Sequence, residues 1–225
     1  ATAGRYTQLP VSRLLAQENK LKSESCIQYN VGAQYEGDGR FYKAELYYKK
    51  YDRLALVEKG TVDAAEVLTS GGYGYSKGFD LFFNDRVLLK NLEYQLSYTY
   101  NIAKRKFQEY TELTTPQYAT QHNASLVLKY SIPRIGTIVG LTNRFSSGRP
   151  YHNPDLPGLM NDHVKPYNSL DLGLTFLPSK KVIIHASATN ILCRKNEFGR
   201  VNNKAILASN DHFFYIGVFI TLGKK

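Results

Sequence analysis

One short segment of the chain concentrates side chains that can recognise a polar ligand. The segment Ser147–Asn153 contains an arginine, a tyrosine, a histidine and an asparagine, and another arginine precedes it. Arginine forms paired hydrogen bonds with anionic groups, and tyrosine combines ring stacking with a hydroxyl that hydrogen-bonds. The candidate ligand-binding residues are therefore Arg144, Arg149, Tyr151, His152 and Asn153. An equally good explanation is that Gly148, Arg149 and Pro150 only shape the entry of a loop.

The same region holds the best candidate for a metal site. His152 and His163 lie in one polar stretch with Asn153, Asp155 and Asp162. These are possible metal ligands, but a solvated loop explains the same residue types. The expectation is therefore that no metal and no cofactor is bound.

No constellation of residues predicts catalysis. His122, Asn123 and Ser125 are residue types of a hydrolase, but His122 and Asn123 face opposite sides of a strand and cannot converge. The glycines of Gly72–Gly78 are spaced G-x-G-x-x-x-G without a following Lys-Ser or Lys-Thr, so a glycine-bearing strand entry is favoured over a phosphate loop. We predict no catalytic residue and no enzymatic activity.

Composition restricts the class of protein. The 225 residues are 13% aromatic, include no tryptophan and give a formal net charge of +10. Disordered chains are poor in aromatic residues, and no apolar run approaches the roughly 18–20 residues of a membrane-spanning helix. Basic residues are spread along the whole chain rather than gathered in one tail, and no nucleic-acid partner is predicted.

Apolar residues recur with a period of two. Between Leu92 and Ile102 the even positions are apolar or aromatic and the odd positions are polar, which indicates a β-strand with one apolar and one polar face. Similar patterns, some less regular, predict nine strands at Ile27–Tyr35, Tyr42–Tyr51, Tyr73–Phe83, Leu92–Ile102, Ala124–Ile132, Thr137–Phe145, Ser169–Phe176, Val182–Asn190 and Phe214–Leu222. No amphipathic helix is predicted between them. The fold class is therefore all-β and antiparallel.

The connections between these strands alternate between short and long. Short turns are expected at Glu36–Gly39, around Asn84–Arg86, at Pro133–Gly136 and at Pro178–Lys181. Long polar stretches are expected near Leu54–Ser70, Lys104–Tyr118, Ser146–Pro166 and Leu192–Asp211. Strict alternation places all the turns at one end of the sheet and all the long loops at the other. An up-and-down transmembrane β-barrel has this arrangement, with short periplasmic turns and long extracellular loops.

The polar face of the strands distinguishes a membrane barrel from a soluble one. It carries mainly small and amide residues, as at Gln95, Ser97 and Thr99, rather than the Lys and Glu of a surface in bulk water. The apolar rows have aromatic residues towards their ends, as at Tyr42 and Tyr48, where the aromatic girdles of a membrane barrel lie. This pattern favours a polar lumen and a lipid-facing exterior, although a lipocalin-like barrel with a small-residue exterior would imitate it.

Specific strings are spread along nearly the whole chain, namely Tyr29–Gly32, Tyr47–Asp52, Gly72–Phe79, Ser147–Tyr151, Leu170–Leu172, Thr189–Ile191 with Arg194–Asn196 and Phe198–Gly199, and Phe213–Ile220. Together they resemble the barrel of TonB-dependent outer-membrane receptors of the Bacteroidetes type. Their order matches the C-terminal third of that family. Ser147–Tyr151 and the pair formed by Asn190-Ile191 and Phe198-Gly199 are the most specific.

The resemblance implies a plug domain and further barrel strands, which the predicted strands of this chain do not include. Such receptors have a plug domain with a TonB-interacting segment inside a barrel of about 22 strands. Nine strands cannot form that barrel, and Tyr6–Leu15 does not alternate well enough to add a tenth. We interpret residues 1–24 as an extracellular loop or incomplete strand, and residues 25–225 as the C-terminal portion of an outer-membrane β-barrel. Cys26 and Cys193 would pair in a small closed barrel and lie far apart in a large one.

The function implied by the resemblance is that of the barrel part of a TonB-dependent receptor. It would take up a large nutrient, such as a glycan, a siderophore or a cobalamin-like compound, at the outer membrane of a Gram-negative bacterium. The expected partners are outer-membrane lipid and lipopolysaccharide, the plug domain, the remaining barrel strands, and the TonB system through the plug. The alternative is a self-contained small outer-membrane barrel with a structural or adhesive role.

Overall fold

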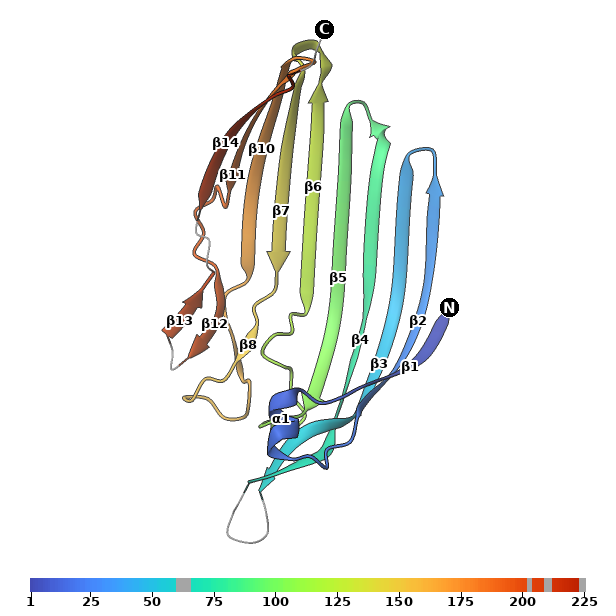
Figure 1. The fold of residues 1–225 in the computed structure, drawn as a ribbon, viewed down its shortest axis with the longest axis vertical. Coiled ribbons are helices and arrows are strands. Elements are labelled where there is room, and N and C mark those ends of the chain that lie inside the picture. Colours follow the sequence, from blue (N-terminus) through green and yellow to red (C-terminus); the bar gives the residue numbers. More distant parts are fainter. Residues whose placement is uncertain (60–65, 202–203, 209–211, 223–225) are drawn as a thin grey trace.

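The computed structural model describes residues 1–59, 66–201, 204–208 and 212–222. Its main element is one antiparallel sheet of ten strands (Figure 1). In spatial order the strands are β1 (Thr2–Gln8), β2 (Glu24–Gly37), β3 (Arg40–Lys59), β4 (Glu66–Leu89), β5 (Leu92–Lys106), β6 (His122–Ile132), β7 (Thr137–Ser146), β10 (Tyr167–Ser179), β11 (Val182–Thr189) and β14 (Phe213–Ile220). Each strand pairs with the next strand of the sheet, so the topology is up and down.

The remaining elements are short. They are the helix α1 (Ser12–Gln17), the 3-10 turn η1 (Pro133–Ile135), the hairpin of β8 (Pro150–Tyr151) with β9 (Asp162–His163), and the hairpin of β12 (Glu197–Val201) with β13 (Lys204–Leu207). Apart from η1, all of them lie at the end of the sheet where the long connections are, which we call the long-loop end (Figure 1). The opposite end is the short-turn end.

All nine predicted strands are present, and one more precedes them. The additional strand β1 pairs with β2 from Thr2 opposite Asn30 to Gln8 opposite Glu24. Its residues on the side away from the polar face are Ala3, Arg5 and Thr7, which do not form an apolar row. The pattern therefore carried no signal, and pairing with the edge of β2 specifies the strand.

One predicted turn is wrong. The connection between β4 and β5 lies at Lys90-Asn91, and Asn84–Arg86 is part of β4. Asp85 is almost completely buried, and its carboxylate accepts hydrogen bonds from the Tyr42 hydroxyl at 2.5 Å and from the backbone N–H groups of Val87 and Leu88 at 2.8 Å each. The Asx-type bonds hold an irregularity in the strand rather than ending it, and the register shifts between Asp85 and Leu89.

The stretch predicted as a loop at Leu54–Ser70 is largely strand. β3 continues to Lys59, and β4 begins at Glu66. Arg53 adopts a left-handed conformation with φ of 62°, and the pairing shifts on either side of Leu54. Beyond this bulge Leu54, Ala55 and Leu56 are buried. A continuously apolar run replaces the alternation here, and the loop after β5 is bonded to it, since Val57 N–H donates to Gln108 O at 2.7 Å and Gln108 N–H donates to Ala55 O at 2.6 Å.

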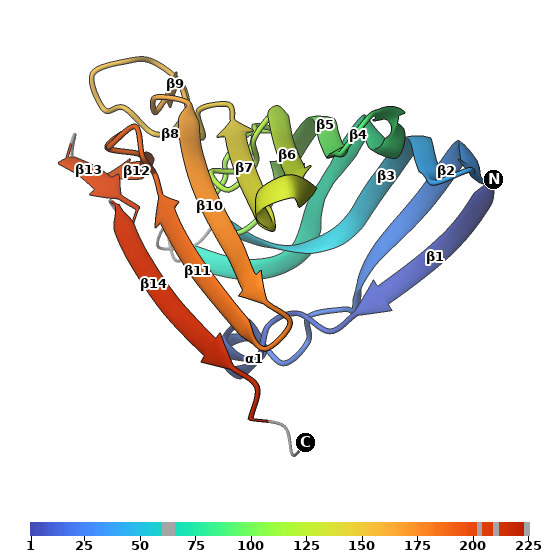
Figure 2. The ribbon, with the colours of Figure 1, turned by 90° about the horizontal axis from the view of Figure 1, so that it is seen from above.

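The sheet is strongly curved and open (Figure 2). One pocket groups Gln28, Glu45, Asp80 and Thr99 from four successive strands, so these residues lie on the concave face. Cross-strand register and the alternation of side chains then place Tyr29, Leu46, Leu96 and the other apolar rows on the convex face. The predicted segregation of polar and apolar faces is confirmed.

Each edge strand is paired on one side within the described residues. These edges are β1 and β14, whereas the pattern placed the first edge at Ile27–Tyr35. Because the sheet has ten strands, β1 and β14 run in opposite directions and could pair to close a barrel. The two strands are nevertheless not paired with each other. No helix in the described ranges is long and apolar enough to cross a membrane.

Candidate functional site

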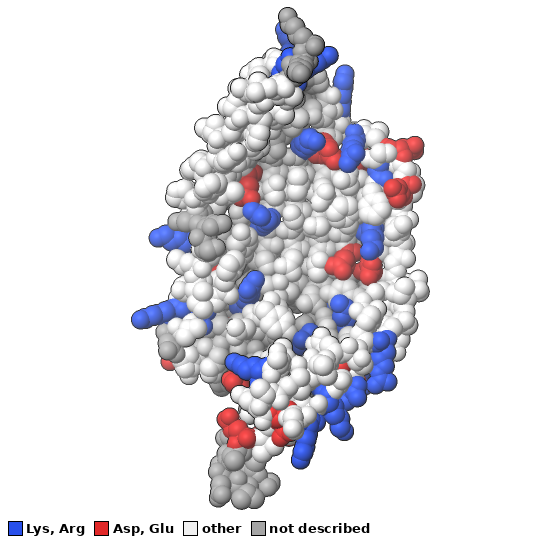
Figure 3. Space-filling view, in the orientation of Figure 1, with Lys and Arg blue, Asp and Glu red and all other residues white. Residues whose placement is uncertain are grey.

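The concave face carries a hydrogen-bonded polar groove across β2–β5. The Tyr47 hydroxyl and the Ser76 hydroxyl both donate to Asn101 Oδ1, at 3.0 and 2.7 Å, and the Thr99 hydroxyl donates to Asp80 at 2.5 Å. A space of about 400 Å³ lies over these residues. Acidic and basic side chains are mixed across the same hollow face (Figure 3). The groove offers hydrogen-bond donors and acceptors to a polar solute.

Arg105 joins this groove to the loops above it. Its guanidinium lies 4.1 Å from the ring centre of Tyr51 and 5.8 Å from that of Tyr118, which belongs to the loop after β5. Stacking of a guanidinium on aromatic faces is favourable and keeps the charge oriented. A backbone bridge fixes the same loop to the sheet, since Arg105 N–H donates to Thr114 O at 2.8 Å.

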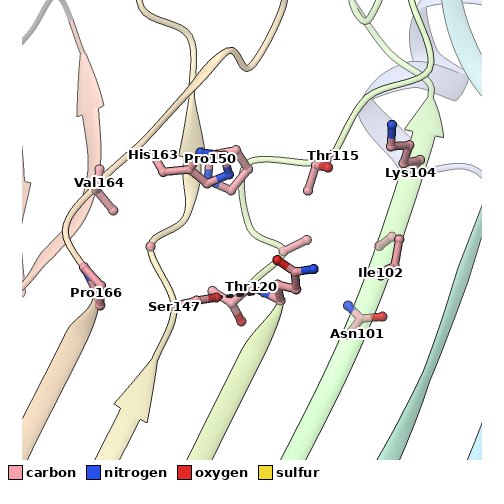
Figure 4. Close-up of a pocket in the computed structure, with 14 residues that line it drawn as sticks. Asn101, Ile102, Lys104, Thr115, Thr120, Ser147, Pro150, His163, Val164 and Pro166 are labelled. Atoms are coloured by element: carbon pink, nitrogen blue, oxygen red, sulfur yellow. Dashed lines mark hydrogen bonds between the residues drawn. The ribbon is translucent and has the colours of Figure 1, made fainter.

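A cavity of about 380 Å³ opens at the long-loop end, between the end of β5 and three loop segments (Figure 4). Asn101 and Ile102 lie on the β5 side, and Ser147, Pro150 and Val164 lie on the other. The Ser147 hydroxyl oxygen accepts hydrogen bonds from the backbone N–H groups of Gln121 and His122, at 2.9 and 3.0 Å. Ser147 thus ties the segment before β8 to the start of β6.

Two of the five predicted ligand-binding residues build the loop itself. The Tyr151 ring is buried, and its hydroxyl donates to Asp162 Oδ2 at 2.6 Å across the β8–β9 pair. The Asn153 side chain donates to the same oxygen at 3.0 Å and accepts from the N–H of Asp155 at 3.0 Å. These contacts favour the interpretation that this part of the motif shapes the loop.

The other three predicted residues have different environments. Arg144 lies on the concave face of β7 and forms an ion pair with Asp171 of β10. Arg149 is half-buried, with its guanidinium 4.9 Å from the ring centre of Phe198, and His152 is exposed. The structure therefore brings Tyr151 and Asn153 together, while Arg144, Arg149 and His152 occupy separate positions around the opening.

Sequence reasoning missed the partners that hold this hairpin. Asp162 appeared only as a metal candidate, yet it bonds Tyr151 and Asn153. Arg200 of β12 lies 5.7 Å from the Tyr151 ring centre and pairs with Glu197 at 3.0 Å. A cross-strand Tyr–Asp pair at the two ends of a loop is a usable signal, but the contact with Arg200 comes from a different hairpin. Only the packing of the two loops produces it.

The electrostatics of the hairpin follow from the Tyr151–Asp162 hydrogen bond. Donation from Tyr151, then from Asn153, lowers the pKa of Asp162. The same bond to a carboxylate raises the pKa of Tyr151, and the bond to Glu197 raises the pKa of Arg200. The phenol, the carboxylate and the guanidinium therefore keep their usual neutral-pH protonation states.

The stability of the hairpin should decline at both extremes of pH. Because the folded pKa of Asp162 is depressed below 3.8, its contribution is present above that value and is lost as the pH falls through the folded pKa. Because the folded pKa of Tyr151 is raised above 10.0, its contribution is present below that value and is lost as the pH rises through the folded pKa. Hydrogen exchange of the Val164 amide, measured across the pH range, reports both losses.

A Tyr151→Phe variant tests the assignment to this pair. We expect the pKa of Asp162, followed by NMR of its carboxyl carbon, to rise towards 3.8. The matched variant Tyr98→Phe removes a hydroxyl that is bonded to His122 on β6, and it should leave Asp162 unchanged. An unaltered Asp162 titration in Tyr151→Phe would contradict the assignment.

Neither the cysteines nor the histidines form a cluster. Cys26, on the concave face of β2, and Cys193, in an exposed loop, are both free thiols. Across the described part of the chain, no group of three or more His, Cys, Asp or Glu side chains is arranged to hold a metal ion.

The chain is similar in sequence to one protein family. The model of the family described as "TonB dependent receptor-like, beta-barrel" matches residues 2–191. No curated protein matches the chain.

Solved structures similar to the chain include an import receptor, a pyoverdine-bound protein and a copper transporter. The ferric-catecholate import receptor Fiu from E. coli K12 is 12% identical, with a TM-score of 0.75 over 96% of this chain and 32% of that one. FpvA from P. aeruginosa, bound to a heterologous pyoverdine with iron, is 15% identical, with a TM-score of 0.75 over 96% and 30%. The copper transporter OprC is 16% identical, with a TM-score of 0.71 over 96% and 36%. The chain spans about a third of the length of these structures.

Proposed function

The chain belongs to the TonB-dependent receptor-like β-barrel family, whose members are receptors of the Gram-negative outer membrane rather than enzymes; on that premise we propose that it forms part of the wall of a receptor for a large nutrient. The nutrient is a glycan, a siderophore or a cobalamin-like compound, and its uptake depends on the TonB system. The assignment to the Bacteroidetes type stays a prediction.

One observation carries this proposal. A single open sheet presents a polar concave face and an apolar convex face, and all its long loops lie at one end. In a membrane these features make the concave face one side of a water-filled lumen and the convex face the lipid contact. The short turns then face the periplasm, and the long loops face the outside.

The unpaired edges argue against the self-contained small barrel. In hydrocarbon each unpaired backbone N–H or C=O group costs several kcal/mol, and β1 and β14 each leave such a row within the described sheet. We propose that further strands pair with both edges. The partners of the chain are then the remaining barrel strands, a plug domain that contacts TonB, and outer-membrane lipid and lipopolysaccharide. Nucleic acid is not a partner.

The ligand contacts are proposed at the long-loop end. In the β8–β9 loop the His152 side chain is exposed and the Arg149 guanidinium lies against Phe198, while Arg144 lies below them on the concave face and pairs with Asp171. Tyr151 and Asn153 contribute by holding the loop that carries Arg149 and His152. Two of the similar structures are named for iron complexes of chelators and one for copper, which supports a chelated metal as the first ligand class to test.

The test measures uptake by cells that produce the complete receptor. Three probes represent the three classes: a ferric catecholate, cyanocobalamin and a fluorescent oligosaccharide. We expect one of them to accumulate only in cells with intact TonB, and Arg149→Ala with His152→Ala to reduce that uptake. The control Lys180→Ala, at the short-turn end, should not. Absence of TonB-dependent accumulation for all three probes would reject the proposal.

A further inference from the structure

Four lysines gather on the convex face of three neighbouring strands, close to the long-loop end. They are Lys50 of β3, Lys77 of β4, and Lys104 and Lys106 of β5, and we call them the lysine patch. In the sheet register Tyr75 lies between Lys50 and Lys104, and Tyr73 lies beside Lys106. The Lys77 ammonium is 5.8 Å from the ring centre of Tyr75. The patch is thus interleaved with tyrosines whose hydroxyls suit a membrane interface.

The lysine patch has a large excess of positive charge. Lys50 has 57% of its side chain exposed, and its ammonium lies 3.6 Å from Asp52, the one carboxylate in these cross-strand rows of β3–β5. Two lysines of the concave face instead pair with glutamates of the same face. Lys43 pairs with Glu45 at 2.7 Å, and Lys129 lies 3.9 Å from Glu93. The convex lysines therefore need counter-charges from outside the chain.

The position of the patch along the strands coincides with a membrane boundary. On the convex face of β3, charged residues stand at Arg40 and at Lys50, and the residues between them on that face are Tyr42, Ala44, Leu46 and Tyr48. Ten residues at roughly 3.3 Å each span about 33 Å, or about 25 Å along the membrane normal for a tilt of about 40°. That is the height of the apolar band of a membrane β-barrel.

We propose that the lysine patch binds the phosphate groups of a lipid headgroup in the membrane leaflet on the long-loop side. Lys50 and Lys104 flank Tyr75 with their Cα atoms about 10 Å apart, twice the spacing of adjacent strands. Their flexible side chains can therefore reach one phosphorylated headgroup from two sides, while their methylene stems stay on the apolar surface. Such a contact both satisfies the charges and anchors the rim of the barrel.

This inference rests on the proposed function only for the membrane orientation of the sheet. Strands that complete the barrel pair at the edges β1 and β14, so they do not cover the convex face of β3–β5. Lipid therefore meets Lys50 and Lys77 on this face, and Lys104 lies between the lipid and the cavity of the long-loop end, which it also lines. Free phosphate could bind the same lysines, and the experiment below distinguishes it from a lipid headgroup.

The test counts bound lipid on the complete receptor by native mass spectrometry after reconstitution in phosphatidylcholine vesicles. The vesicles contain either a diphosphorylated lipid A or the same lipid without phosphates. The variant Lys50→Gln/Lys77→Gln/Lys104→Gln is compared with Lys43→Gln/Lys49→Gln/Lys129→Gln, which removes the same charge from the concave face. We expect the first variant to lose at least about tenfold in binding of the diphosphorylated lipid, and the second to lose little.

Each further arm supports or overturns the proposal. Replacement of the same three residues by arginine should preserve binding, because the charge is kept. Equal binding of the phosphorylated and dephosphorylated lipids, or equal losses in the two glutamine variants, would overturn it. Release of the lipid by an equal concentration of inorganic phosphate would also overturn it, since the site would then be a simple anion site. Failure to insert into vesicles of any composition would instead reject the membrane-barrel assignment itself.

Discussion

Leu172→Arg is expected to lower the free energy of unfolding of the membrane-inserted protein by about 2–4 kcal/mol, whereas Thr175→Arg should cost much less. Leu172 lies in the middle of β10 on the convex face, and 41% of it is exposed. Thr175 lies on the concave face, where its hydroxyl is hydrogen-bonded to His185 at 2.9 Å. Arginine at the first position meets hydrocarbon, and at the second it meets the lumen.

The measurement is reversible urea unfolding of the complete barrel in lipid vesicles. A second pair, Leu96→Arg and Ser97→Arg on β5, provides an independent comparison at adjacent positions on opposite faces. Equal losses within each pair would show that the two faces are not in different media. In that case the convex face would have to be a surface in water or a protein interface.

Gly148→Ala is expected to destabilise the loops of the long-loop end by about 1–3 kcal/mol, the range for overpacking a close contact. A Cβ at Gly148 would lie 1.9 Å from the backbone oxygen of Val164 and 3.5 Å from the Cβ of His163. The first distance is far below any real contact, so one backbone must move. The hydrogen bond from Val164 N–H to Arg149 O, 3.0 Å in the native loop, would then be lost.

Gly140→Ala is the matched control for this prediction. It lies on the preceding strand β7, and a Cβ there would have 3.8 Å to its nearest neighbour, the oxygen of Gly173. We expect it to be tolerated. Faster hydrogen exchange of Val164 and Tyr151 should appear in Gly148→Ala alone. The same protection in both variants would mean that the two segments are not packed as closely as the structure has them.

These two substitutions separate two kinds of information. The contrast between Leu172 and Thr175 is predictable from the sequence, because alternation assigns neighbouring residues to opposite faces. The constraint at Gly148 is not, since it depends on Val164, which follows a further loop. The motif Ser147–Tyr151 therefore marked an important region, but its chemistry was ambiguous until its neighbours were known.

The clarity of the apolar alternation also explains which strands are predicted correctly. Leu92–Ile102 alternates clearly and is predicted correctly, whereas Thr2–Gln8 has no apolar row and is specified by its partner β2. Asn84–Arg86 has the composition of a turn, yet it is part of β4, and its buried Asp85 carboxylate accepts a hydrogen bond from Tyr42 of the neighbouring strand β3. A turn signal is outweighed here by a cross-strand hydrogen bond.

The all-β class, the two faces of the sheet and the segregation of turns from loops follow from local sequence, because a period of two and a turn composition are properties of neighbouring residues. The open edges at β1 and β14, the contacts among Tyr151, Asp162 and Arg200, and the lysine patch on β3–β5 are visible only in the folded chain. Each of these depends on register or loop packing, which joins residues that are distant in the chain.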